Sequence, residues 1–239
     1  IAAGFNDGAI DHFKGQRLSS LIREVIQNSL DAKERADSPV RIYIDLVELD
    51  ASACPEIGEL YEALKQSRDA AAEQNVTHAV SFYDLALGEV KSNSVNFLCL
   101  HDENTTGLTG DLDGPGGSWF ALTKGAGLSQ KSDPGSLGSF GHGSKAPFTM
   151  SNLRSVFYYT EIGSDAHSTV RFQGKSILQS HKDSSTGQVT QGTGFYGYAS
   201  GCRALENENI PRWPGKLREK HTLKRGTSIY VPATDYSVD

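Results

Sequence analysis

The chain has 239 residues, of which 37% are hydrophobic and 22% charged, which is the composition of a soluble globular protein long enough to bury a sizeable core. Its 23 basic and 29 acidic residues give a net charge of -6, which argues against a general nucleic-acid-binding or anionic-membrane-binding surface. No apolar run approaches the roughly 20 residues of a membrane span, and the first residues do not have the pattern of a secretory leader.

Helix and strand patterns alternate in the first part of the chain. Apolar residues at helical spacing predict a helix over residues 18–36, with the sequence DSP as its stop signal. The β-branched, nearly alternating residues 40–49 predict a strand. Residues 55–74 have a helix-forming composition with a proline near the first turn, and a second short helix is expected over residues 80–87. Together they form a helical insert over residues 51–90.

A buried strand and a glycine-rich segment follow. The compact apolar run over residues 95–102 predicts a buried strand that ends on Asp102. Eleven of the 37 residues from 107 to 143 are glycine, so this segment cannot be mostly regular structure. The remaining pattern predicts strands over residues 153–162, 168–178, 192–200 and 226–233, with turns near Gly163 and over residues 183–187. The pattern alone indicates a mixture of α and β structure.

Three polar residues share one side of the first predicted helix. At about 100° per residue, Glu24, Asn28 and Asp31 fall within roughly 60° of arc, next to the apolar stripe. One interpretation is a solvated flank with capping or ion-pair partners. The alternative is chemical, because a carboxamide oxygen can ligate Mg²⁺ and a carboxylate one turn earlier can orient and deprotonate a water.

Asp102 is the second candidate. A carboxylate at the end of a strand, followed by the sequence ENTTGLTG, can simply cap a turn. The functional alternative is base recognition, because a carboxylate that only accepts hydrogen bonds suits the exocyclic amine of adenine in a dry pocket.

The third candidate is the sequence GSLGSFGHGSKAPFTMS over residues 135–151. Such glycine loops often just turn the chain. The functional alternative is phosphate binding, because glycines let backbone N–H groups approach phosphate oxygens and a following short helix adds partial positive charge. The pattern is neither the Walker motif nor the dinucleotide fingerprint.

The order of these blocks resembles that of the GHKL ATPase superfamily. E-x-x-x-N-x-x-D-A on a first helix is followed by a strand ending in Asp, a G-[LM]-T turn, a glycine-rich gap, G-x-x-G-x-G and a late GT entering a strand. Members include DNA gyrase B, the ninety-kilodalton heat-shock chaperones, MutL, MORC proteins and sensor histidine kinases. The resemblance covers residues 18–232. It implies one ATP-binding domain over residues 1–239, with an α+β fold: a two-layer α/β sandwich whose mixed, mostly antiparallel sheet has helices on one face.

The resemblance assigns roles on the first helix. It implies that Asn28 ligates Mg²⁺ and bridges it to the triphosphate of ATP. Glu24 would be the catalytic carboxylate that activates the attacking water. Asp31 and Ala32 complete this block, and Asp31 is expected near the adenine or the ribose.

The resemblance also assigns the adenine site. Asp102 would read the adenine N6 amine, helped by Thr227 through a water, with Gly107 and Leu108 beneath the base. The usual D-x-G-x-G of the family is here D-E-N-T-T-G, with the first glycine absent and one residue added. We therefore expect adenine to sit slightly differently, with Asp102 keeping its role.

The phosphate side is expected in the glycine-rich part of the chain. The resemblance implies that residues 110–137 form a lid over ATP. The following residues, at the base of that lid, are expected to contact the nucleotide: Gly138, Gly141, His142, Gly143, Ser144 and Lys145. For the histidine a structural role is the alternative. Lys124 is expected to pair with phosphate from the lid, although for this lysine and Lys145 a solvated position is the alternative.

The expected function is a Mg²⁺-dependent ATPase that acts as a conformational switch, closest to the gyrase, chaperone, MutL and MORC branch and of bacterial origin. Lid closure would build an ATP-dependent homodimer, and hydrolysis by the isolated domain would be slow or absent because a following domain completes the site. The alternatives are a kinase domain of the histidine-kinase or anti-sigma type, and a nucleotide sensor without turnover. Expected partners are ATP or ADP, a second copy, and a downstream domain or another protein, but neither nucleic acid nor a membrane.

The cysteines indicate the compartment. Cys54, Cys99 and Cys202 are odd in number, widely spaced and match no metal-site pattern, so we expect reduced thiols in a cytoplasmic protein. The chain begins at Ile1 rather than a methionine, and we expect it to be the N-terminal part of a longer protein.

Overall fold

The computed structural model describes residues 4–5, 17–112, 114, 116–125, 145–164 and 167–235. The strands within these ranges are β1 (Arg41–Asp50), β2 (Ser94–Glu103), β3 (Ser155–Ser164), β4 (His167–Ile177), β5 (Thr193–Tyr196), β6 (Leu205–Glu206) and β7 (Gly226–Pro232). The α-helices are α2 (Arg17–Asp31), α3 (Tyr61–Glu73), α4 (Thr77–Val90), α5 (Ser118–Thr123), α6 (Ala146–Thr149) and α7 (Arg212–Glu219). Short 3-10 helices cover Ala51–Ala53, Pro55–Leu60, Ser200–Cys202 and Asn207–Asn209.

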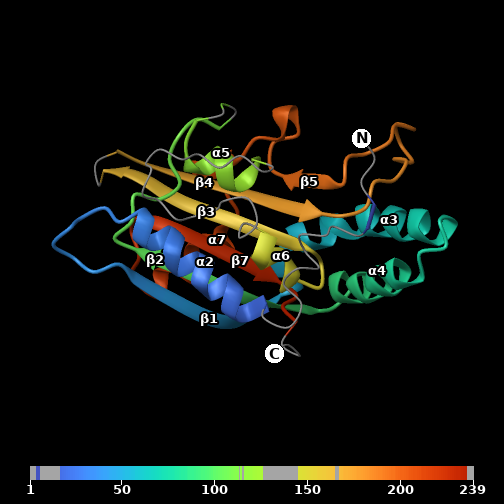
Figure 1. Ribbon diagram of the computed structural model, residues 1–239, viewed down its shortest axis with the longest axis horizontal. Coiled ribbons are helices and arrows are strands. Elements are labelled where there is room, and N and C mark those ends of the chain that lie inside the picture. The colour runs from blue at the N-terminus through green and yellow to red at the C-terminus, as the bar shows by residue number, and fades with distance from the viewer. Residues whose placement is uncertain are drawn as a thin grey trace.

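The strands form one seven-stranded sheet in the order β1-β2-β7-β3-β4-β5, and β6 pairs with β4. Every pairing among the described strands is antiparallel. The last strand, β7, therefore lies in the middle of the sheet, between β2 and β3 (Figure 1). This order places the start of β7 beside the end of β2, where Asp102 lies.

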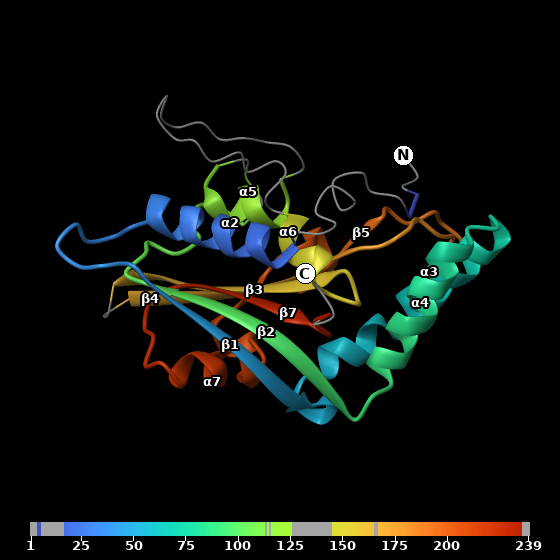
Figure 2. The same ribbon diagram turned by 60° about the horizontal axis from the view of Figure 1, so that its bottom comes forward.

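Helices cover both faces of the sheet (Figure 2). On one face, Leu21 and Val25 of α2 pack against Leu98, Leu100 and other residues of β2, β7 and α6. On the opposite face, α7 contributes a tryptophan whose ring contacts four aromatic rings of the sheet, those of Phe97, Phe157, Phe172 and Tyr230. Helices α3 and α4 lie at one end of the sheet (Figure 1).

The predicted fold class is confirmed as an α+β fold with a seven-stranded, antiparallel, open sheet and helices packed on it. The structure adds α7 on the second face, which the sequence pattern did not predict. The sequence did not indicate this helix because this part of the chain contains residues that disfavour helices, namely Pro211, Pro214 and Gly215. Pro214, however, lies in the first turn of α7, where a missing N–H costs little.

The first helix was predicted to continue to residue 36, and this prediction is wrong: α2 ends at Asp31. Residues 32–36 have helix-forming composition, but their backbone groups form hydrogen bonds with the loop after β2 instead of continuing the helix. The N–H of Glu34 donates to the Asn104 carbonyl at 3.0 Å, and the N–H of Thr106 donates to the Ala32 carbonyl at 2.9 Å. These long-range bonds outweigh a weak local preference for helix.

The other predicted elements differ mainly in their bounds. The helix expected over residues 55–74 begins as a 3-10 helix, and the short helix expected over residues 80–87 is the 14-residue α4. All three cysteines are free; Cys54 and Cys99 are buried and Cys202 is exposed. Among the helices of the described ranges, none has the length and apolar character needed to cross a bilayer.

Candidate functional site

A cavity of about 490 Å³ lies between α2, the strands β2 and β7, and the segment that leads into α5. This volume is within the range of pockets that hold small-molecule ligands and cofactors. The lining combines apolar side chains, such as Val25, Leu100 and Ile229, with polar ones, such as Asn28 and Asp102.

The cavity brings together residues that are almost 200 positions apart in the chain. Among the residues that the sequence singled out, those that line it are Asn28, Asp31, Ala32, Asp102, Gly107, Leu108 and Thr227. Glu24, Lys124 and Lys145 are not among the lining residues. Gly138, Gly141, His142, Gly143 and Ser144 lie outside the described residues, as does much of the expected lid.

Asp102 is a buried carboxylate whose orientation is fixed from three sides. Its Oδ1 accepts hydrogen bonds from the Thr227 N–H at 2.6 Å and from the Thr105 hydroxyl at 2.7 Å, and its Oδ2 accepts one from the Ser29 hydroxyl at 3.1 Å. Only 8% of the residue is exposed. Because Oδ2 receives a single bond, it retains acceptor capacity for a ligand in the cavity.

Burial and hydrogen bonding shift the pKa of Asp102 in opposite directions. Burial raises the pKa of Asp102 above its ordinary value, because a carboxylate in a dry environment loses its hydration. The hydrogen bonds from Thr227, Thr105 and Ser29 and the charge of Arg218 act in the opposite direction. The surrounding donors thus favour the ionised form that burial disfavours.

The residue before Thr227 has to be a glycine. Gly226 has φ +118°, and a Cβ at this position would lie 2.4 Å from Oδ1 of Asp102 and 2.6 Å from its carbonyl oxygen. A side chain would therefore displace the carboxylate that β7 positions. The GT pair at the start of β7 is explained by this close approach.

Asn104 occupies the position at which the sequence departs from the family pattern. It adopts a left-handed conformation with φ 61°, which asparagine tolerates better than most residues. Its Nδ2 donates to the carbonyls of Ser38 at 2.8 Å, Arg35 at 3.2 Å and Pro39 at 3.3 Å. Its Oδ1 accepts from the Arg35 N–H at 3.2 Å. The asparagine at this position thus connects the loop after β2 to the loop after α2.

Gly107 and Leu108 close one side of the cavity against β3. Gly107 has φ +69°, and a Cβ there would lie 2.7 Å from the Thr160 hydroxyl. The Leu108 N–H donates to the same hydroxyl at 2.8 Å, and that hydroxyl donates to the Gly226 carbonyl at 3.1 Å. Thr160 therefore couples this turn to the start of β7.

On α2, Glu24 and Asn28 interact with each other. The Asn28 Nδ2 donates to Oε1 of Glu24 at 3.2 Å, so the Asn28 carbonyl oxygen keeps its acceptor capacity for a ligand. Partial burial raises the pKa of Glu24; the Asn28 hydrogen bond opposes this and the charge of Asp31 adds to it. Asp31 accepts a hydrogen bond from Gln27 at 2.9 Å at the exposed end of the helix.

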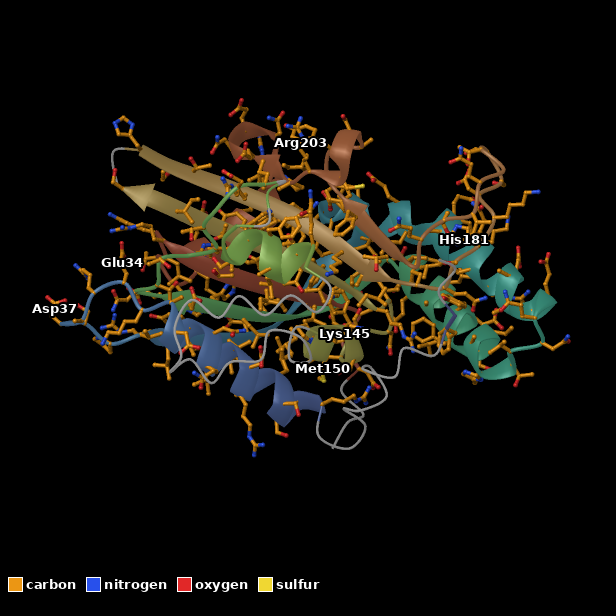
Figure 3. All side chains as sticks on the ribbon, turned by 45° about the horizontal axis from the view of Figure 1, so that its top comes forward. Glu34, Asp37, Lys145, Met150, His181 and Arg203 are labelled. Atoms are coloured by element: carbon orange, nitrogen blue, oxygen red, sulfur yellow. The ribbon has the colours of Figure 1, made fainter. Side chains whose placement is uncertain are left out.

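The two candidate lysines lie away from the cavity lining. Lys124, directly after α5, donates to the Gly201 carbonyl at 3.3 Å. Lys145 is the residue before α6, which lies at the end of α2 away from Glu34 (Figure 3). Arg17 at the start of α2 contacts α6, because its guanidinium donates to the Thr149 carbonyl at 3.0 Å. Phosphate contacts by either lysine stay a prediction.

Ser29 and Thr105, which hold Asp102, were not predicted. Ser29 follows Leu21 and Val25 at spacings of four residues, so a hydroxyl on the buried stripe of the helix was the available signal. No such pattern marks Thr105, because its role depends on the shape of the turn. No group of three or more His, Cys, Asp or Glu side chains in the described ranges forms a metal site. An Asn28-bound Mg²⁺ would therefore depend on ligand phosphates and waters.

Comparisons with known proteins do not identify this chain. No protein-family model matches it, and a search of curated proteins found no matching relative.

Proposed function

We propose that this chain is a Mg²⁺-dependent ATP-binding and ATP-hydrolysing domain that acts as a nucleotide-driven conformational switch in a larger protein. The observation that carries the proposal is the convergence on one cavity of the buried Asp102 and of Asn28, which is bonded to Glu24. The GHKL resemblance expects adenine recognition, metal binding and water activation at these three residues. Their closeness in space supports that expectation independently of their order in the sequence.

Asp102 accounts for a preference for adenine. Its carboxylate is an acceptor held in place by Thr105, Thr227 and Ser29. A ligand in the cavity would have to present a donor to Oδ2, and the exocyclic amine of adenine is such a donor. The carbonyl oxygen that guanine carries at the same position would face the carboxylate and be rejected.

Glu24 and Asn28 account for hydrolysis. The Asn28 carbonyl oxygen would be the protein ligand of Mg²⁺, and the ion supplies neutralisation of the phosphate charge when it is bound with the nucleotide. Glu24 lies one turn earlier, bonded to the Asn28 amide. Its raised pKa makes it a stronger base towards a water that it orients for in-line attack.

Calorimetry with ATP and ADP, with and without Mg²⁺, tests binding. The wild type is expected to bind ATP in a Mg²⁺-dependent manner, and Asp102→Asn is expected to weaken binding by roughly tenfold or more, because the amide places a donor opposite the adenine amine. The control is Asp69→Asn, which removes an exposed carboxylate on α3. A folded wild type that binds neither nucleotide would contradict the proposal.

Phosphate release separates a hydrolase from the two alternatives. In the larger protein that contains this domain, Glu24→Gln is expected to lower turnover by roughly a hundredfold or more and to leave ATP affinity nearly unchanged, because the residue acts on the water. Equal turnover in the wild type and Glu24→Gln would argue against hydrolysis at this site. Transfer of labelled phosphate to a protein instead of water would favour the kinase alternative.

A further inference from the structure

Arg218 of α7 is a buried guanidinium without a carboxylate partner among the described residues. Only 2% of it is exposed. Its Nη1 donates to the Ser228 hydroxyl at 2.5 Å, and its Nη2 donates to the Arg225 carbonyl at 3.2 Å. The guanidinium lies over the Tyr159 ring at 5.2 Å, and its Nε has no hydrogen-bond partner in the part of the chain that the structure describes. A charge this deeply buried is costly unless an opposite charge compensates it.

The two groups that Arg218 contacts bracket the part of β7 that positions Asp102. Between Arg225 and Ser228 lie Gly226, which leaves space for the carboxylate, and Thr227, whose N–H donates to it. Arg218 approaches this segment from the α7 face of the sheet, whereas Asp102 lies on the α2 face. Arg218 therefore bonds Ser228 and the Arg225 carbonyl, and Asp102 bonds the Thr227 N–H between them from the opposite side.

Four other ionisable groups lie near Arg218: Asp45, His101, Glu161 and Glu219, the last two acting with it on the Tyr159 ring. Asp45 accepts from Lys220 and His221. His101 faces α7 and bonds the Ser228 hydroxyl at 2.8 Å, and burial lowers its pKa to about 3, so it is neutral at physiological pH.

On the cavity side, Asp102 is in contact only with neutral donors. They come from α2, from the turn after β2 and from β7, and they are Ser29, Thr105 and the Thr227 N–H. Asp102 has no hydrogen bond to the nearby ionisable residues of α2 and β2, which are Glu24, Asp31 and Glu103. Glu103 instead accepts hydrogen bonds from Arg41 and Tyr43. Arg218 is the one cation whose charge acts on Asp102 within the described ranges.

We propose that Arg218 is a positioning residue for the cavity: from the opposite face of the sheet its guanidinium fixes residues 225–228 and, through them, the carboxylate of Asp102. Its positive charge also acts on that carboxylate, in the direction that favours the ionised form against burial. The ligand consequence rests on the proposed adenine recognition, because an ionised, fixed Asp102 is what would receive the adenine amine. The electrostatic part does not rest on it, since it concerns two residues of the chain alone.

The carbon-13 NMR titration of the Asp102 carboxyl tests the electrostatic part without any nucleotide. Arg218→Gln keeps hydrogen-bond donors but removes the charge, and it is expected to raise the pKa of Asp102. Arg218→Lys keeps the charge and is expected to leave that pKa close to the wild-type value. Arg212→Gln, at an exposed arginine of the same helix, is the matched control. An unchanged Asp102 pKa in Arg218→Gln would overturn the proposal.

The pH dependence of ATP binding tests the ligand consequence. In Arg218→Gln, the loss of affinity on acidification is expected to begin at a higher pH than in the wild type, with roughly a tenfold loss per pH unit below the Asp102 pKa. A loss that is equal at every pH would indicate only a structural role and would overturn the proposal. If Arg218→Gln does not fold, Arg218→Met is the second neutral variant for both measurements. If the wild type binds no ATP, the proposed function fails, and the NMR titration still decides the role of Arg218.

Discussion

Asn104 shows how a single side chain joins two loops beside the carboxylate-bearing end of β2. Its four hydrogen bonds reach three residues of the loop between α2 and β1, and its own carbonyl accepts from the Glu34 N–H. Only 9% of Asn104 is exposed, so its amide is held by these bonds, although Arg35 and Pro39 among its partners are exposed. The residue therefore combines a backbone conformation that suits glycine with bonds that glycine cannot make.

Replacing Asn104 by glycine is expected to lower the free energy of unfolding by about 1–3 kcal/mol, because the lost hydrogen bonds outweigh the relief of backbone strain. The control is Asn75→Gly. Asn75 has φ 58° but is exposed at the end of α3, so the change is expected to be neutral or slightly stabilising. Urea denaturation measures both. Equal effects at the two positions would contradict the role given to the Asn104 side chain.

At the scale of elements, a carboxylate on the edge strand holds the end of α7. Asp45 of β1 accepts from Lys220 Nζ at 2.7 Å and from the His221 ring, which stacks on Tyr43 at 4.4 Å between ring centroids. Burial alone would raise the pKa of Asp45, but the hydrogen bonds and charges of Lys220 and His221 lower it below its ordinary value. The contact therefore stabilises the fold when Asp45 is ionised.

A lowered pKa in the folded state fixes the sign of the pH dependence. The stabilisation is complete above the ordinary carboxylate pKa and is lost as the pH falls through the lower, folded value. Asp45→Asn is thus expected to be about 1 kcal/mol less stable than the wild type at about pH 7, and the difference is expected to shrink towards zero in strong acid. Urea denaturation across this pH range measures it. A difference that grows on acidification would contradict the assignment.

Helices α3 and α4 are attached to the sheet by a buried tyrosine. The Tyr83 hydroxyl oxygen accepts from the Gln179 N–H at 2.8 Å, and Tyr83 is fully buried. Tyr83→Phe would leave that N–H without an acceptor, which is expected to cost about 1–3 kcal/mol of stability. Tyr61→Phe on α3, where the ring contacts Lys91, is the control with an expected change near zero. Thermal denaturation compares the two, and equal losses would contradict this attachment.

The sequence predicted the long strands well, because alternating or continuous apolar residues report directly on burial in a sheet. It did not predict α7, whose prolines and glycine mask a helix, or the early end of α2, which depends on bonds to Asn104. For the site, Asn28, Asp102 and Thr227 were predicted to lie together, and they line one cavity. Ser29 and Arg218 were missed, because their roles arise from contacts between segments distant in the chain.

At the scale of the whole molecule, the cavity is lined by α2 and lies on its face of the sheet. Helices α3 and α4 lie at an end of the sheet (Figure 1). Saturating ATP is therefore expected to protect amides unevenly from hydrogen exchange. Protection is expected in α2, in residues 102–109 and at the start of β7, and little change is expected in α3 and α4. At about 100 times its dissociation constant, the ligand is expected to stabilise the fold by about 2.7 kcal/mol. Uniform protection, or protection centred on α3 and α4, would contradict this location.

The three thiols differ in a way that has a practical use. Burial raises the pKa of Cys54 to about 11 and that of Cys99 to about 12, so both are protected from alkylating reagents in the native state. Cys202 is exposed and follows Gly201, whose carbonyl receives the Lys124 side chain from the end of α5. The unaltered protein thus carries a built-in attachment point for a maleimide fluorophore. Such a dye would sit beside the end of α5, a helix whose Ala121 and Leu122 line the cavity, and its emission would follow rearrangements of that helix without any engineered cysteine.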